Sequence, residues 1–197
     1  MAGVAVLAAD GFETIECLTV VDVLRRGGVR TALVSIMDSR DVVTSQQIPV
    51  TCDAMLDEID FSDYDYIVLP GGLPGATNLR ANERVCELVR EFAATKHVAA
   101  ICAAPFILAE LGVLEGHRAT CFPGFDSNFP EGCHAGERTV IVDGNIITAS
   151  VTSPESLYSE NLVTFEESDY NQDDATGFIN LWGLPDTVLA LREQGKL

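Results

Sequence analysis

The sequence predicts an α/β fold, a three-layer α/β/α sandwich with a mostly parallel sheet. Short apolar runs at residues 3–8, 64–69 and 98–101 have the length and composition of strands that are buried on both faces. Amphipathic segments of helical length alternate with these runs. A strand–helix–strand alternation is typical of a parallel sheet that helices cover on both sides.

The first half of the chain supplies the opening strand–helix–strand unit. After the strand at 3–8, residues 15–26 are predicted to form a helix, which Gly27-Gly28 ends. Residues 30–36 read as a second strand. Residues 42–50 alternate in polarity and carry Pro49 near their end, which indicates a hairpin or an edge element.

The second half continues the alternation. Residues 82–95 are predicted to form a helix capped by Asn82, and a helix at 103–111 follows the strand at 98–101 with almost no loop. Three further short strands are predicted at residues 118–122, 139–142 and 145–149. A last helix is predicted at residues 176–192, where Gly183 and Pro185 must break or kink it.

The domain organisation follows from the absence of repeats and linkers. We expect one domain over residues 1–197, with an acidic insertion at about 151–174 that contains seven acidic residues and no Lys or Arg. Loops of this length are either functional lids or mobile surface, and the lack of a second signal favours mobile surface.

The composition excludes several classes of partner. Twelve Lys and Arg stand against 30 Asp and Glu, and the net charge of −18 disfavours binding to nucleic acid or to a membrane surface. No apolar stretch approaches the roughly 20 residues of a membrane helix, and the N-terminus lacks a basic leader. The six cysteines form no CxxC pair, which favours reduced thiols in a cytoplasm and argues against a zinc site.

The strongest chemical signal is the segment 100–105, Ala-Ile-Cys-Ala-Ala-Pro. A strand ends there, Cys102 follows, and a helix begins with Pro105 in its first turn, as in a nucleophile elbow. We expect the positive end of that helix to favour the thiolate of Cys102. The alternative, that Cys102 is a small buried apolar residue, is equally compatible with the local pattern.

Two further segments follow strands at the same predicted edge. Gly71-Gly72 could bring backbone N–H groups close to a substrate oxygen, although an ordinary turn is the commoner meaning of such a pair. Glu13 and Glu16 follow the first strand, and either could be a helix-terminal acid that complements the helix dipole. Glu16 is the better candidate to point inward and hold a proton, because apolar Leu18 follows it.

These motifs together resemble the ThiJ/PfpI superfamily, in the branch of the Parkinsonism-associated protein deglycase and its bacterial relatives. The resemblance rests on residues 11–26, 64–76, 99–105 and 119–124. It implies a flavodoxin-like sandwich of the class I glutamine amidotransferase type, assembled as a homodimer and needing no cofactor. It places the reactive cysteine on Cys102, its protonated partner on Glu16, and the oxyanion-binding N–H groups on Gly72 and Ala103.

The resemblance implies two functions for Cys102. The first is a glyoxalase or deglycase that acts on methylglyoxal, another small 2-oxoaldehyde or early glycation adducts. The alternative is a redox sensor or chaperone in which Cys102 is oxidised to a sulfinate, and a cysteine peptidase is a weaker third reading. The chain departs from the family by placing Phe122 where many relatives have a histidine. It also has Asp173-Asp174 where they have a Gly-Pro turn.

Overall fold

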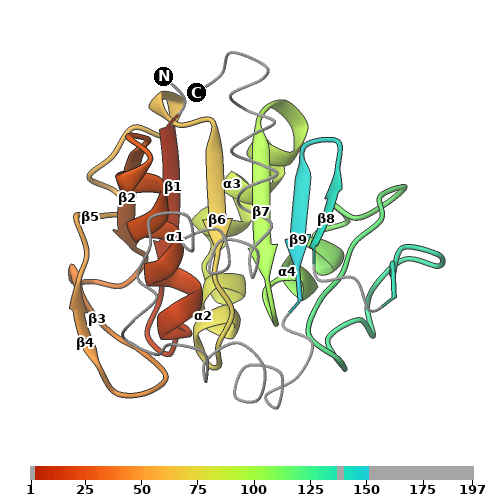
Figure 1. Cartoon of the computed structure of the whole chain (residues 1–197), viewed down its shortest axis with the longest axis horizontal. Coiled ribbons are helices and arrows are strands. Elements are labelled where there is room, and N and C mark those ends of the chain that lie inside the picture. Colours follow the sequence, from red (N-terminus) through yellow and green to blue (C-terminus); the bar gives the residue numbers. More distant parts are fainter. Residues whose placement is uncertain (1–2, 137–139, 151–197) are drawn as a thin grey trace, which may run out of the picture.

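In the computed structural model of this protein, residues 3–136 and 140–150 are described. They form a seven-stranded sheet in the order β5-β2-β1-β6-β7-β9-β8, with a separate two-stranded sheet of β3 and β4 (Figure 1). All pairs of the main sheet are parallel except β8 with β9. The main strands are Gly3–Ala8 (β1), Arg30–Ser35 (β2), Ala54–Met55 (β5), Tyr66–Leu69 (β6), His97–Ile101 (β7), Val140–Asp143 (β8) and Ile146–Ala149 (β9).

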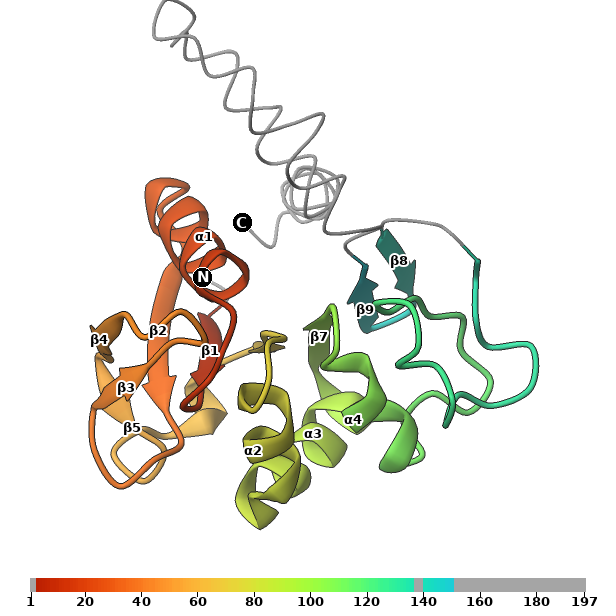
Figure 2. The same cartoon turned by 90° about the horizontal axis from the view of Figure 1, so that it is seen from below.

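Helices cover both faces of this sheet. Figure 2 shows α1 on one side and α2, α3 and α4 on the other, which confirms the predicted three-layer arrangement. The helices are Thr14–Arg26 (α1), Gly75–Ala81 (α2), Glu83–Thr95 (α3) and Pro105–Glu110 (α4), with a 3-10 turn at Phe61–Asp63. Among the described residues, no helix is long and apolar enough to cross a membrane.

The alternation of side chains along β1 explains why this strand is apolar throughout. Val4, Val6 and Ala8 pack with α1, whereas Ala5 and Leu7 pack with the helices of the opposite face. Every residue of β1 is therefore buried. Burial on both faces is the environment that a continuous apolar run predicts.

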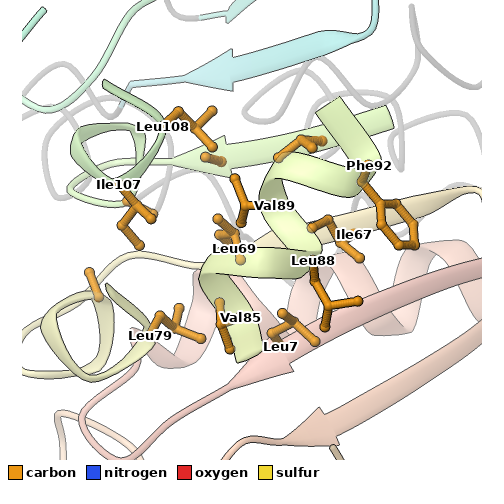
Figure 3. Close-up of a cluster of buried hydrophobic side chains, with 14 of the residues drawn as sticks. Leu7, Ile67, Leu69, Leu79, Val85, Leu88, Val89, Phe92, Ile107 and Leu108 are labelled. Carbon is orange, nitrogen blue, oxygen red and sulfur yellow. The ribbon is translucent and has the colours of Figure 1, made fainter. Parts of the chain in front are cut away.

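The larger core lies between the sheet and the helices α2, α3 and α4. Leu88, Val89 and Phe92 of α3 lie over Ile67 and Leu69 of β6, and all five side chains are fully buried (Figure 3). Asn82 caps α3 as predicted, because its side-chain oxygen accepts a hydrogen bond from the N–H of Val85 at 3.1 Å. This packing fixes the ends of β6 and β7, where the candidate site lies.

The segment 42–50, predicted as a hairpin or an edge element, forms a hairpin. Strand β3 (Asp41–Val43) pairs antiparallel with β4 (Pro49–Thr51), outside the main sheet. The predicted strand at 118–122 is wrong, since only an isolated bridge joins Ala119 to His134. Its later N–H groups bond instead to Thr148 Oγ1 and to the carbonyl of Cys102, on different segments of the fold.

Some elements were not predicted, and some predictions are not tested. The short helix α2 and the two-residue strand β5 carry too little periodicity to be recognised in the sequence. The predicted acidic insertion at 151–174 and the predicted helix at 176–192 lie outside the described residues.

Candidate active site

Three chemically distinctive segments meet at the carboxyl edge of the sheet. Strand β6 pairs in parallel with both β1 and β7, so the residues that follow these three strands lie side by side. Ligands of open α/β sheets bind at this edge. The segments are 10–16 after β1, 70–75 after β6 and 102–105 after β7, as the sequence predicts.

Cys102 occupies a strained turn between β7 and α4. Its φ of 59° lies in the left-handed region, which non-glycine residues seldom adopt. The turn is held on both sides, because the Cys102 N–H donates to the carbonyl of Ala149 and the Phe122 N–H donates to the carbonyl of Cys102, each at 2.8 Å. The side chain stays partly exposed while the other five cysteines are buried. This is the geometry of a nucleophile elbow.

Glu16 lies beside Cys102 and is 3% exposed. Its carboxyl group accepts a hydrogen bond from the Gly71 N–H at 2.8 Å and is within hydrogen-bonding reach of the Cys102 side chain. Burial raises the pKa of Glu16 from 4.5 to about 7, although the two hydrogen bonds oppose this shift. A carboxyl group with this pKa can hold or release a proton near neutral pH.

The Cys102 thiol is less acidic than the sequence suggests. Burial raises its pKa above the usual value, the nearby Glu16 raises it further, and the Ala103 N–H acts in the opposite direction. Burial and Glu16 thus act against the expected stabilisation of the thiolate by the N-terminus of α4, which begins at Pro105, and that stabilisation stays a prediction. Glu16 and Cys102 thus form a coupled pair in which the loss of one proton disfavours the loss of the second.

The two glycines after β6 allow the three segments to approach closely. A side chain at Gly71 would place its Cβ 2.6 Å from Oε2 of Glu16 and 2.8 Å from Cβ of Cys102. Gly72 has a φ of 83°, and a Cβ there would lie 2.3 Å from the Glu13 nitrogen. Both positions therefore require glycine, for space at Gly71 and for space and backbone conformation at Gly72.

The predicted oxyanion-binding groups lie next to this pair. Ala103 directly follows Cys102, and its N–H reaches the Cys102 sulfur. Gly72 follows Gly71, which contacts both Glu16 and Cys102. Among the described residues, neither the Gly72 N–H nor the Ala103 N–H donates to an oxygen atom. In this part of the chain the Gly72 N–H thus has no oxygen partner, and the Ala103 N–H is directed at the Cys102 sulfur.

Sequence reasoning left out the contributions of Gly71 and of the β3–β4 hairpin. Gly71 orients the carboxyl group of Glu16 through its N–H, and only the Gly-Gly pair signalled this position. From the hairpin, Ser45 Oγ and Gln46 Nε2 donate to Oε2 of Glu13 at 3.0 and 2.9 Å. No local pattern indicates these contacts, because they join residues more than thirty positions apart.

Aromatic and histidine residues near the site play other roles. The ring of Phe122 packs against that of Phe125 with centroids 6.2 Å apart. His134 pairs with Asp126 at 3.6 Å and packs edge-on against Phe129. In the described ranges, no three His, Cys, Asp or Glu side chains are grouped so that they could hold a metal ion.

Comparison with known proteins agrees with this architecture. Residues 2–164 match the sequence profile described as the DJ-1/PfpI family. A protein named a deglycase from Pyrococcus abyssi is 34% identical over 159 residues, which cover 79% of this chain and 93% of that protein. The structure of oxidised DJ-1 from Toxoplasma gondii superposes with a TM-score of 0.74 at 31% identity, covering 91% of this chain and 97% of the other.

Longer relatives also match. The Protein DJ-1 homolog B of Arabidopsis thaliana is 38% identical over 143 residues. That alignment covers 72% of this chain but only 32% of the plant protein. The chain thus spans about a third of the length of this relative.

Proposed function

Because this chain belongs to the DJ-1/PfpI family, we propose that it is a glyoxalase or deglycase whose nucleophile is Cys102. The observation that carries the proposal is the contact between buried Glu16 and the partly exposed Cys102 at a strained turn. A nucleophile, a group that exchanges protons near neutral pH and two N–H donors are what carbonyl chemistry needs. Relatives named deglycases support the carbonyl or glycated class of substrate.

The reaction begins when the Glu16 carboxylate takes the proton of the Cys102 thiol, and the resulting thiolate adds to the aldehyde carbon of a 2-oxoaldehyde such as methylglyoxal. A carbon–sulfur bond forms, and the carbonyl electron pair moves to oxygen. The N–H groups of Gly72 and Ala103 stabilise this oxyanion until it takes up a proton, which gives a hemithioacetal. Glu16 supplies or relays that proton, since its pKa of about 7 leaves both protonation states populated.

Rearrangement and hydrolysis complete the cycle. Glu16 as carboxylate removes the proton from the former aldehyde carbon, and an enediol forms as the neighbouring ketone oxygen is protonated. Return of a proton to the second carbon gives the thioester of a 2-hydroxy acid. Water then cleaves the thioester and restores Cys102. The sum is addition of one water to methylglyoxal to give lactate, with no external oxidant or reductant and no metal or organic cofactor.

The proposal extends to the partners and location of the whole protein. We propose that it acts on free 2-oxoaldehydes or on early glycation adducts, in the cytoplasm and as a homodimer. Large exposed apolar side chains on α1 and on the β3–β4 hairpin support self-association, namely Ile15, Val43 and Ile48. Light scattering of the purified protein will measure the oligomeric state.

The decisive experiment is lactate production from methylglyoxal by the purified full chain. We expect turnover by the wild-type protein and none by Cys102→Ser. Cys86→Ser is the matched control, because Cys86 is a buried cysteine of α3. Equal lactate production by wild type and Cys102→Ser would overturn the proposal, as would the absence of lactate with the wild type.

A second experiment tests the pairing of Glu16 with Cys102. Glu16→Gln keeps the size of the side chain but cannot exchange the proton. We expect the pH dependence of Cys102 alkylation to shift in this variant, because the nearby glutamate contributes to the raised pKa of Cys102. An unchanged pH profile would contradict the coupling between the two residues.

One observation favours the alternative function. The contacts of the sulfur with Glu16 and the Ala103 N–H would also suit a sulfinate, whose oxygens accept hydrogen bonds. The Toxoplasma gondii relative has been solved in an oxidised form. If this alternative holds, dilute peroxide adds two oxygen atoms to Cys102 and the protein shows little or no turnover. The two functions are distinguished by measuring the intact mass before and after oxidation together with lactate production.

A further inference from the structure

Glu13 is a second acidic group at the site, and the mechanism does not use it. Its backbone N–H donates to the carbonyl of Gly71 at 3.0 Å, and its nitrogen lies against Gly72. Glu16 follows it by about one turn of α1. Its negative charge acts on both Glu16 and Cys102, because it contributes to the raised pKa of each.

The β3–β4 hairpin holds the Glu13 side chain in place. Ser45 and Gln46 both donate to Oε2 of Glu13, and Thr14 Oγ1 in turn donates to the side-chain carbonyl of Gln46 at 2.7 Å. The Ser45 N–H also donates to the backbone carbonyl of Phe12 at 2.9 Å. The carboxylate is therefore oriented by neutral donors that leave its charge uncompensated.

One oxygen of this carboxylate remains available. Within the described part of the chain, Oε1 of Glu13 accepts no hydrogen bond and no cation pairs with the group. A fixed negative charge whose field reaches the nucleophile attracts cationic groups and repels anionic ones. Its free oxygen could also accept a hydrogen bond from an amine.

From this arrangement we propose that Glu13 is a specificity-determining residue, which selects carbonyl compounds that carry a neutral or positively charged group beside the reacting carbonyl and rejects those that carry a carboxylate. This inference rests on the proposed function for the identity of the reaction. The favoured substrates are then neutral 2-oxoaldehydes and carbonyl adducts of amines. Anionic 2-oxoacids are excluded by like-charge repulsion rather than by size.

The test uses two alkylating agents that share one leaving group and have similar size. Iodoacetamide is neutral and iodoacetate is an anion, so the ratio of their rates at Cys102 reports the charge of the site. Because both react with the same thiolate, the fraction of thiolate cancels in the ratio. At physiological salt the Debye length is about 8 Å, so distant surface charges contribute little.

We expect Glu13→Gln to raise the rate with iodoacetate relative to iodoacetamide by about three- to tenfold. Glu91→Gln is the matched control, since this exposed residue lies toward the C-terminal end of α3, which leads into the start of β7 and away from the site. An unchanged ratio in Glu13→Gln, or the same rise in both variants, would overturn the inference. The alkylation ratio does not depend on turnover. If the wild type produced no lactate, the proposed reaction would be refuted, but the alkylation ratio would still test the role of Glu13.

Discussion

Cys102 and Cys17 make an instructive pair, because both lie within electrostatic reach of Glu16 and burial raises the pKa of both thiols. Cys17 is completely buried among the apolar residues that α1 packs against the sheet. Cys102 is partly exposed, sits on a left-handed turn and receives an N–H from Ala103. The difference teaches that access and directed hydrogen bonds, not acidity alone, distinguish a candidate nucleophile from a structural cysteine.

The comparison is tested most directly by alkylation of the folded protein. We expect iodoacetamide to modify Cys102 at least about a thousandfold faster than Cys17, because Cys17 reacts only when the fold opens locally. Peptide mass spectrometry after a short pulse will measure both rates. Comparable rates at the two cysteines would show that the elbow gives Cys102 no special reactivity.

Glu16 itself provides the next test, through the pH dependence of stability. Burial raises its pKa from 4.5 to about 7, so between these pH values the folded state keeps a proton that the unfolded state releases. Stability is therefore lost as pH rises through this window. Glu16→Gln removes that loss. We therefore expect the free energy of unfolding of the variant minus that of the wild type to increase by up to about 3 kcal/mol between pH 5 and pH 8.

Urea unfolding at both pH values measures this difference. Glu58→Gln is the control, because a hydrogen bond from the Met55 N–H lowers the pKa of Glu58 below 4.5, so the effect of this substitution on stability changes little between pH 5 and pH 8. The stability that the Glu58 carboxylate contributes is lost as pH falls through its lowered pKa. If the difference in free energy of unfolding between wild type and Glu16→Gln does not vary with pH, then folding does not raise the pKa of Glu16.

The smallest effect is expected from a single methyl group at the contact between the segments. Gly71→Ala places a Cβ against Glu16 and Cys102, so we expect a loss of about 1–3 kcal/mol in stability and slower alkylation of Cys102. Gly27→Ala is the control, since a Cβ at Gly27 meets atoms only at 3.4 Å and beyond. Denaturant unfolding and alkylation of the two variants will compare them, and equal behaviour would show that the approach at Gly71 is not tight.

Much of the fold was determined by the sequence alone. The continuous apolar run of β1 and the helical spacing of apolar residues in α1 and α3 act within one element, so local pattern reveals them. The position of Cys102 between a strand and Pro105 likewise predicts an elbow at the carboxyl edge. These features depend on the spacing of apolar residues along a strand or a helix, and a short stretch of sequence is enough to show that spacing.

Only the tertiary structure decided how the site is assembled. The sequence favoured Glu16 as the inward-pointing acid, but it could not show that the Gly71 N–H, 55 positions away in the chain, orients the buried carboxyl group. Residues 119–122 bond to Cys102, Thr148 and Cys133 instead of extending a strand. The physical reason is the same in each case. Which residues are buried, and which distant segments they bond to, depends on how the layers pack, and the local periodicity of the sequence contains no information about that packing.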